Sequence, residues 1–569
     1  MSSFIGVYGE DSSIRNKIEA LTQNSDFSFQ NESLFIASEV HPQTTHIHTN
    51  PDQESGWIVC GIGIDSEQSK VLSKKEWASF FTEGIDVQTG LDGHFAIAKW
   101  GQNTVELITD QVGMRNIFIY RNKEFTLFST RLDWMIKLIP NPSINWHHFG
   151  SNWLGITPFS SGCLINKIDR LAQGGKAIVT NSEYNFTNSR WSPSPKKESA
   201  PNMERVLTSV SLAALNTFSD TSLGLSGGLD SRVLFGILLG QNSNQWDIYT
   251  FDNFAHPDVK TAQLLNQPFG KNHQIFPVSL PAPEEIIGKM EDLTVRSQFT
   301  SSIAALPAHF GYQQLGKKEQ ITIDGAFGEI GRRRFLRGAE LREKKRIEDW
   351  GVDRLLPYFR ETKADIFTND IIKQMEKGFK QSFENEFEEM PHVKELGTAN
   401  WFDLLTIRTR AQNLYGPKQG ISDEMLFHYM PFVQPSFLNT IFLTPEKHRV
   451  NANLFRSIIK KSAPELGKVN LVKGDDSYPY WMKDISAMLW MKTTSKLGMR
   501  FNETTLIKML FSLEEYMFDT INSRHFKECS YYDLLKVQAL ISDFYKGKDY
   551  SKTSQLNWLI NFEIFRKQI

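Results

Sequence analysis

Residues 223–239 read LGLSGGLDSRVLFGILL, and this stretch decides the fold of the second half of the chain. Leu223–Leu225 is typical of the end of a short buried strand, and Val233–Leu239 is an apolar helical run. Between them, Ser226–Ser231 brings small residues to a helix N-terminus. Backbone N–H groups and the positive end of the helix dipole face the same point there. This junction predicts an anion site.

The residue types of SGGLDS suit a polyphosphate. Gly227 and Gly228 let the backbone approach a phosphate that a Cβ would block, and Ser226 and Ser231 add hydroxyl donors. Asp230 suits another task, because a carboxylate beside a polyphosphate is tolerable mainly as a Mg²⁺ ligand. The segment is not a Walker loop, since GxxxxGK[ST] is absent. A plain Ser/Gly turn with an Asp N-cap is the alternative interpretation.

The overall composition narrows the class of protein. A chain of 569 residues predicts two or more domains. The formal net charge of −2 provides no basic field for nucleic acid and no polybasic membrane patch. Cys60, Cys163 and Cys529 lie too far apart for a metal motif or a disulfide framework, so we expect a cytoplasmic protein. We find no apolar run that predicts membrane insertion, and no signal peptide.

Residues 1–190 are expected to form an α+β domain of layered, mostly antiparallel sheets. Short β-type runs bounded by turn residues recur here: Phe4–Tyr8, Trp57–Cys60, His94–Trp100, Thr104–Asp110, Asn116–Tyr120, Phe125–Ser129 and Lys176–Thr180. Residues 181–202 are polar and contain Pro193, Pro195 and Pro201, which indicates a domain boundary.

Residues 200–569 are expected to form an α/β domain with a parallel sheet and a helical C-terminal part. Strand and helix patterns alternate from residue 203 onward, which places ligands at the carboxyl ends of the strands. The predicted elements are helix Met203–Phe218, strand Trp246–Phe251, helix His256–Asn266 and strands Asn272–Val278 and Glu319–Asp324. Residues 338–400 are strongly charged and are expected to form surface helices, more a lid or insertion than core.

Several segments carry a family resemblance. SGGLDS resembles the pyrophosphate loop of the ATP pyrophosphatase superfamily, whose members cleave ATP to AMP and pyrophosphate. MSSFIGVYG, LDGHFAIAKW and ITDQVGMRNIFIY resemble the class II amidotransferase domain of asparagine synthetases. The chain is therefore identified as similar to the asparagine synthetase family over nearly its whole length. That resemblance implies an Ntn-hydrolase-like first domain, an adenine-nucleotide α-hydrolase-like second domain, and ATP and Mg²⁺ as cofactors.

Position 2 departs from the family pattern. The family has a Cys there, exposed after Met removal, that attacks the glutamine amide, whereas this chain has Ser2. A serine hydroxyl needs a strong local base, which an N-terminal amine can supply. The family's Asn-Gly-Glu-type glutamine-binding segment is also missing, and Cys60–Asp65 stands roughly in its place. These two losses favour a domain that keeps the fold without glutaminase activity.

The resemblance implies further site residues. Residues 325–334 read GAFGEIGRRR and resemble the second family signature, Ser-Gly-Glu-Gly-(Ala/Ser)-Asp-Glu. It places Gly325 at the nucleotide and Glu329 on the metal-binding Asp or on the neighbouring Glu. Asp324 is a second candidate acid. Arg332–Arg334 suit a carboxylate or pyrophosphate, and a solvated basic helix face is the alternative.

The same resemblance places Leu225, Thr250 and Phe251 at the nucleotide. Lys473 matches, within a residue or two, a family lysine that contacts the phosphates and the adenylated intermediate; Lys468 is the neighbouring competitor. A flexible ammonium suits charge that develops on the departing pyrophosphate.

Taken together, the sequence predicts an AMP-forming carbon–nitrogen ligase. A carboxylate, on a small molecule or a precursor peptide, is adenylated and then joined to an amine. Asp230 and Glu329 are the expected metal ligands, and Lys473 and Glu329 the expected catalytic residues. One alternative is an intramolecular cyclase, since β-lactam synthetases and lasso-peptide cyclases resemble this pattern. Another is a non-catalytic nucleotide-binding protein. A tRNA-modifying enzyme is disfavoured, because paired cysteines and a basic RNA face are absent. Biosynthetic-pathway proteins are the expected partners.

Overall fold

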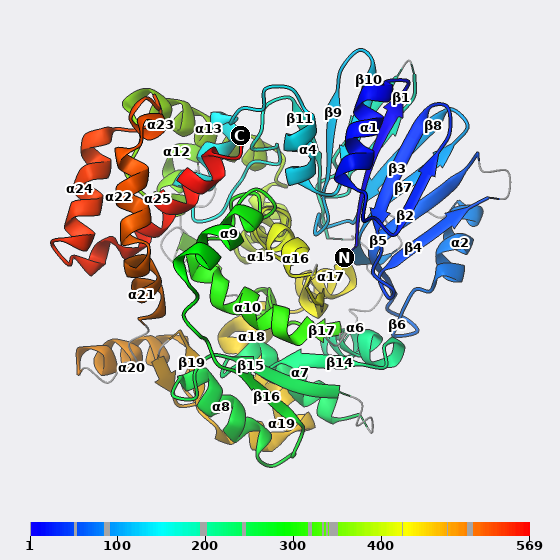
Figure 1. Ribbon diagram of the computed structural model, residues 1–569. Coiled ribbons are helices and arrows are strands. Elements are labelled where there is room, and N and C mark those ends of the chain that lie inside the picture. Colours follow the sequence, from blue (N-terminus) through cyan, green and yellow to red (C-terminus); the bar gives the residue numbers. More distant parts are fainter. Residues whose placement is uncertain are drawn as a thin grey trace.

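The computed structural model describes residues 2–50, 54–84, 91–181, 183–193, 202–241, 246–316, 321–332, 335–336, 339–340, 351–423, 425–474, 476–497 and 504–569. Antiparallel sheets make up much of the first part of the chain, and a parallel sheet surrounded by helices follows (Figure 1). Among the described residues, no helix combines the length and the apolar composition that a membrane crossing requires.

Two antiparallel sheets face each other in residues 3–187. Their strand orders are β11-β9-β10-β1-β3-β2 and β13-β12-β8-β7-β5-β4, with β6 paired to β5. Side chains of one face of each sheet, such as Phe4 and Ile36 against Ala96 and Leu107, form the buried core between them. The strands are β1 (Ser3–Gly9), β2 (Phe27–Gln30), β3 (Leu34–Glu39), β4 (Thr45–Thr49), β5 (Gly56–Asp65), β6 (Lys70–Val71), β7 (Asp92–Gly101), β8 (Thr104–Thr109), β9 (Ile117–Arg121), β10 (Phe125–Ser129), β11 (Ile168–Leu171), β12 (Lys176–Val179) and β13 (Tyr184–Thr187).

Helices cover the outer faces of both sheets. Ile14 and Ile18 of α1 (Ser12–Leu21) belong to the same buried cluster as Ile5 of β1. On the other side, Trp77 of α2 (Lys74–Glu83) packs edge-on against Phe95 of β7, with ring centroids 5.4 Å apart. The expectation of layered antiparallel sheets is confirmed.

A five-stranded parallel sheet forms the core of the following part. Its order is β16-β15-β14-β17-β18, so β14 lies at the centre and the chain continues first to one side and then to the other. The strands are β14 (Thr221–Gly224), β15 (Trp246–Phe251), β16 (His273–Phe276), β17 (Ile321–Ile323) and β18 (Phe427–Tyr429). Because β14 and β17 are parallel neighbours, with Leu223 opposite Ile323, the loops that follow them meet at one edge.

Helices surround this sheet and build the C-terminal part. Those that match the sequence predictions are α6 (Met203–Thr217) and α8 (Pro257–Asn266), which begin after side-chain caps at Asn202 and His256. Helix α7 (Leu229–Leu239) contains the predicted apolar run 233–239. Helix α4 (Leu132–Leu138) belongs to the antiparallel part, where it packs against β9, β10 and α1. The others are α5 (Trp146–Leu154), α9 (Pro283–Leu293), α10 (Leu306–Leu315), α12 (Val352–Leu355), α13 (Asn369–Glu388), α14 (Val393–Leu396), α15 (Thr398–Thr406), α16 (Gly416–Ser422), α17 (Pro435–Leu443), α18 (Glu446–Arg449), α19 (Asn453–Ser462), α20 (Asp484–Lys496), α21 (Thr505–Ser512), α22 (Glu514–Asn522), α23 (Arg524–Lys527), α24 (Leu534–Tyr545) and α25 (Thr553–Arg566).

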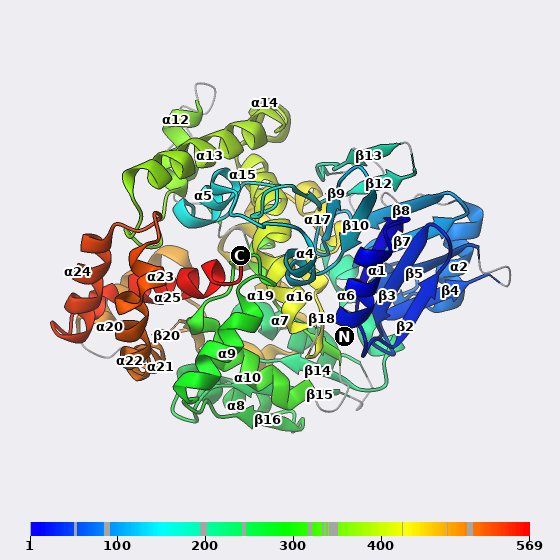
Figure 2. The same ribbon diagram turned by 45° about the horizontal axis from the view of Figure 1, so that its top comes forward.

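Residues 338–400 were expected to form surface helices, more a lid or insertion than core, and residues 341–350 lie outside the described residues. The long helix α13 is a surface helix with one buried face. It packs lengthwise against α5 (Figure 2). A Cβ on Gly150 would lie 2.3 Å from the Met375 carbonyl oxygen, and one on Gly378 would lie 2.2 Å from the His147 carbonyl oxygen, so glycine is needed at both crossings. Most of its charged residues lie on the outward face of the helix, whereas Glu386 is buried.

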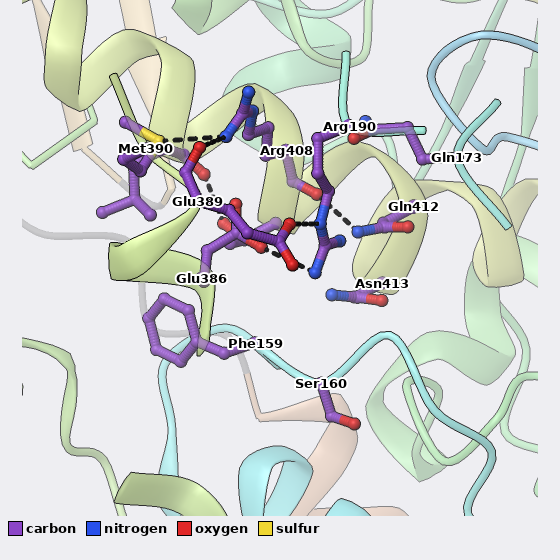
Figure 3. A network of polar contacts seen from close by, with 12 residues as sticks. Phe159, Ser160, Gln173, Arg190, Glu386, Glu389, Met390, Arg408, Gln412 and Asn413 are labelled. Atoms are coloured by element: carbon purple, nitrogen blue, oxygen red, sulfur yellow. Dashed lines mark hydrogen bonds and ion pairs between the residues drawn. The ribbon is translucent and has the colours of Figure 1, made fainter. Parts of the chain in front are cut away.

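A buried polar network fixes the end of the first part of the chain to the helices of the second (Figure 3). Arg408 donates hydrogen bonds of 2.8 Å to the Trp191 carbonyl and to Ser192 Oγ. Arg190 pairs with Glu386 at 3.2 Å and with Glu389 at 2.6 Å. Arg408 belongs to a π-helix, η6 (Ile407–Tyr415), whose wide turns occur frequently at functional sites.

Candidate active site

The predicted anion loop lies at the carboxyl end of β14. Helix α7 begins at Leu229, so Asp230 and Ser231, expected in the loop, lie in its first turn. Within the described residues, no side chain caps this helix at Gly228. Its first-turn N–H groups therefore point toward the loop without a side-chain acceptor, as an anion site requires.

The three N–H groups just before the helix are bonded within the protein, which corrects the expectation that they face a phosphate freely. Gly227 N–H donates to Asp258 Oδ1 at 2.7 Å, and Gly228 N–H to Ser226 Oγ at 3.2 Å. Ser226 N–H donates to Ser231 Oγ, also at 3.2 Å. The Asp258 carboxylate, in the first turn of α8, takes a place that the sequence assigned to phosphate. Anion binding therefore depends more on the first turn of α7 than on Gly227.

The segment after β17 packs directly on the start of α7. A Cβ on Gly325 would lie 3.0 Å from Ser231 N, and one on Gly328 would lie 2.6 Å from the side chain of Asp230. Phe327 between them is buried and has φ +69°, a left-handed conformation that is unusual outside glycine. These close approaches bring the loops of β14 and β17 together, as the partial signature predicted.

Arg332 and Asp230 form a two-pronged ion pair at this contact. Arg332 Nε lies 2.7 Å from Asp230 Oδ1, and Nη2 lies 2.6 Å from Oδ2. Burial lowers the pKa of the Arg332 guanidinium. The negative charges of Asp230 and, to a smaller extent, Glu329 raise this pKa by more, so that it lies above the ordinary value. Of the two interpretations of this arginine, the structure supports carboxylate binding, with a carboxylate of the protein itself. Arg333 and Arg334 lie outside the described residues.

Glu329 lies beside this ion pair and has its own partner. Tyr415, the last residue of η6, donates a hydrogen bond of 2.7 Å to Glu329 Oε1. Burial and the Glu329 charge raise the Tyr415 pKa, so the phenol stays protonated and acts as a donor. The sequence carried no signal for Tyr415.

Asp324, the second candidate acid, has a local structural role. Its Oδ1 accepts a hydrogen bond of 2.8 Å from Ala326 N–H, which closes the turn after β17. Its Oδ2 accepts from Gln419 at 3.4 Å. In the part of the chain that the structure describes, no group of three or more His, Cys, Asp and Glu side chains is arranged to hold a metal ion.

A cavity of about 330 Å³ lies in front of the start of α7. Glu329 and Arg332 line it, together with Lys473 from the hairpin β19 (Leu471–Lys473) and β20 (Asp476–Tyr478). Lys468 lies elsewhere, 3.9 Å from Glu465, beside a separate cavity. The structure therefore brings Lys473, and not its competitor, to the loop. The remaining lining residues are Gly228, Leu229, Phe335, Asn451, Ala452, Arg456, Leu471, Val472, Tyr478, Met482, Lys483, Asp484 and Ala487.

Two arginines hold this cavity in shape, and sequence reasoning missed the first of them. Arg232 is fully buried in α7 and donates to the carbonyls of Gly227 at 3.1 Å, Leu466 at 2.9 Å, Val469 at 2.7 Å and Asn470 at 2.6 Å. Arg456, in α19, donates to the carbonyls of Tyr480 and Met482. An arginine inside an apolar helix was the available signal for Arg232, because a buried charge needs partners.

Leu225, Thr250 and Phe251 do not line this cavity. Leu225 is buried, and its carbonyl accepts a hydrogen bond of 2.7 Å from Thr250 Oγ1. Phe251 packs edge-on against Tyr312, with centroids 4.7 Å apart. All three lie at the carboxyl ends of β14 and β15, and their contact with a nucleotide stays a prediction.

Ser2 lies in a different, smaller cavity of about 60 Å³, which Cys60, Arg115 and Arg131 also line. Ser2 Oγ accepts a hydrogen bond from Thr45 at 2.9 Å and donates to the Thr44 carbonyl at 3.2 Å. Residues 60–65, which replace the glutamine-binding segment, continue strand β5.

Comparison with known proteins does not assign the chain to a family. No family model matches the chain, and no curated protein matches it. Among solved structures, the chain is similar to a glutamine-dependent NAD⁺ synthetase from Acinetobacter baumannii in complex with ADP, at 16% identity and TM-score 0.17, over 28% of this chain and 31% of that one. The chain therefore spans about a third of that enzyme's length.

Two further solved structures are also similar to the chain. One is the allosteric regulatory enzyme of purine biosynthesis, at 8% identity and TM-score 0.23, over 50% of this chain and 77% of that one. The other is a glutamine phosphoribosylpyrophosphate amidotransferase from B. subtilis complexed with ADP and GMP. It shows 9% identity and TM-score 0.22, over 57% of this chain and 81% of that one. These scores are too low to establish a common fold.

Proposed function

We propose that the protein is an ATP-dependent, AMP- and pyrophosphate-forming ligase of the asparagine-synthetase-like kind. One observation carries this proposal. Three separate segments meet at one cavity of about 330 Å³. They are the start of α7 with Gly228 and Leu229, which no side chain of the described residues caps, the segment with the acid Glu329, and the hairpin with the cation Lys473. An anion site, a carboxylate and a mobile ammonium are the groups that such a reaction needs.

The donor set suits Mg²⁺. This ion is usually held by one or two carboxylates together with substrate phosphates, so Asp230 and Glu329 suffice without a third protein ligand. When bound, Mg²⁺ supplies charge neutralisation at the departing pyrophosphate. Gly325 and Gly328 leave the two acids a close approach to the loop that any Cβ would block.

The proposed reaction has two steps. A carboxylate oxygen of the substrate attacks the α-phosphorus of ATP, and the bond from that phosphorus to the pyrophosphate oxygen breaks. Lys473 stabilises the charge that accumulates on pyrophosphate. The nitrogen of an amine then attacks the acyl carbon, AMP leaves, and the nitrogen loses one proton. The products are an amide, AMP and pyrophosphate.

Glutamine is not the expected source of the amine in this reaction. Position 2 carries Ser2 in the place of the family cysteine, and residues 60–65 continue strand β5 where the glutamine-binding segment was expected. Free ammonia or an amine of the substrate itself remains as the nucleophile. In the second case the enzyme is a cyclase that forms an intramolecular amide.

The test is ATP–pyrophosphate exchange with pools of candidate carboxylates and Mg²⁺. We expect exchange that depends on one pool and is absent in Asp230→Asn. Asp247→Asn is the matched control, because Asp247 lies near the amino end of β15, on the same sheet but away from the cavity. Exchange by a folded Asp230→Asn variant at the wild-type rate would reject the metal assignment.

A non-catalytic nucleotide-binding protein is the second candidate. It is favoured by one observation, that both carboxylate oxygens of Asp230 are already held by Arg332. ATP binding without exchange in any carboxylate pool would select this alternative.

A further inference from the structure

Asp230 has two competing cationic partners once the proposed function is accepted. In the structure, Arg332 holds Oδ1 at 2.7 Å and Oδ2 at 2.6 Å. The side chains are 18% and 16% exposed, so solvent screens this pair only weakly. A divalent ion at Asp230 would therefore compete with the guanidinium for this carboxylate and would bring further positive charge beside Arg332.

We propose that Arg332 exchanges Asp230 for the phosphates of the nucleotide, so that a divalent metal binds tightly only together with ATP. This inference rests on the proposed function and deepens it, because it assigns Arg332 the coupling between the two ligands.

The geometry allows this exchange within one cavity. Arg332 lines the same cavity as Gly228 and Leu229, at the start of α7 where the phosphates are expected. A guanidinium fork matches phosphate oxygens as well as it matches a carboxylate. The arginine can therefore change partners without leaving the site.

The charge balance gives the direction of coupling. A divalent ion alone would bring positive charge to Asp230 and leave Arg332 beside it without its principal anion. Burying a charge whose partner has been removed is costly. A polyphosphate brings enough negative charge for both cations. The nucleotide therefore raises the affinity for the metal, and the metal raises the affinity for the nucleotide. Thermodynamic linkage requires the two affinities to change by the same factor, typically about 5–150-fold.

The experiment uses Mn²⁺ as the metal probe and α,β-methylene-ATP as the nucleotide, with the full chain. Electron paramagnetic resonance of free Mn²⁺ measures metal binding, and equilibrium dialysis measures the analogue. For wild type we expect weak Mn²⁺ binding that the analogue strengthens by roughly 5–150-fold.

Arg332→Met removes the cation and keeps an apolar stem. We expect this variant to bind Mn²⁺ alone more tightly than wild type, by roughly 5–150-fold. The double variant with Asp230→Asn should lose that binding. In Arg332→Met, the ATP analogue should change the Mn²⁺ affinity little. Arg131→Met is the matched control. Arg131 makes a similar two-pronged pair with Asp133, at 3.1 and 2.6 Å, but does not line this cavity, so its loss should leave binding of Mn²⁺ alone as in wild type.

Two outcomes would overturn the inference. One is a wild-type protein that binds Mn²⁺ through Asp230 equally well with and without the analogue. The other is a folded Arg332→Met variant without any gain in Mn²⁺ affinity. Should Arg332→Met fail to fold, the wild-type titrations decide alone. Failure of the proposed function looks different: the analogue then binds no variant, while Mn²⁺ binding by Arg332→Met still reports whether the arginine blocks Asp230.

Discussion

The phenol of Tyr415, at the end of the π-helix η6, donates a hydrogen bond of 2.7 Å to Oε1 of Glu329. This bond orients one of the two acids proposed to hold the metal. A hydrogen bond to a charged group contributes about 1.5–3 kcal/mol. Tyr415→Phe should therefore slow AMP formation by roughly tenfold to a hundredfold, measured in a single turnover.

Tyr545→Phe is the control for this change. Tyr545 Oη also donates to a buried partner, the Leu510 carbonyl at 2.8 Å, but it lies in α24 and does not line the cavity. Both variants should lose similar stability, and only Tyr415→Phe should lose rate. Equal rates in the two variants would remove Tyr415 from the mechanism.

The hairpin lysine should act mainly in the transition state. Lys473→Ala should bind ATP almost normally, because the start of α7 and the metal still hold the phosphates, while turnover falls by about 10²–10³. Lys473→Arg should not restore the rate fully, because a planar fork cannot replace a compact ammonium. The measurement is single-turnover AMP formation alongside ATP affinity.

Lys468→Ala is the matched control for the hairpin. Its ammonium lies 3.9 Å from Glu465, away from the cavity that Lys473 lines. If Lys468→Ala slowed turnover and Lys473→Ala did not, the catalytic loop would be misplaced by five residues.

The first part of the chain should release no glutamate from glutamine, with or without ATP. The reasons are Ser2 in the place of a nucleophilic cysteine and the missing glutamine-binding segment. Ser2→Ala should leave ligation with ammonia or with the substrate amine unchanged. Glutamate release that disappears in Ser2→Ala would reverse this conclusion.

His428 should make the fold sensitive to acid. It is fully buried, and burial lowers its pKa from 6.5 to about 4, although the Asp423 carboxylate lies 3.6 Å away. Between these values the unfolded chain binds more protons than the folded one, so stability falls as pH drops from 6.5 toward 4. A shift of this size corresponds to about 3 kcal/mol.

The measurement is the free energy of urea unfolding against pH. His428→Gln should show a shallower loss of stability on acidification than wild type, whereas His448→Gln, at an exposed position in α18, should follow wild type. Parallel curves for all three proteins would show that His428 does not contribute.

Local pattern was enough to predict much of the fold. Strand Trp246–Phe251 has the predicted bounds, because its alternation and its flanking turns are properties of the segment itself. The meeting of the β14 and β17 loops followed from strand order in a parallel sheet. The buried face of helix α13 was not foreseen, since its apolar residues at helical spacing, such as Met375 and Phe379, are interspersed among charged residues.

The candidate site was predicted less completely. Glu329 and Lys473 were named from motifs, and the structure places both at one cavity, although their chemical roles stay predictions. Asp258, Tyr415 and the pairing of Arg332 with Asp230 were not foreseen. Each depends on a contact between segments that are distant in sequence, and single-residue chemistry does not specify such contacts.

The π-helix η6 joins two distant parts of the molecule through one backbone. One end carries Arg408, which is buried and bonded to Trp191 and Ser192 just after the antiparallel sheets, and the other end carries Tyr415 against Glu329. A displacement of residues 191 and 192 would therefore reach Glu329 through a single helix. The antiparallel part of the chain can thus influence the candidate site, although none of its described side chains lines the cavity.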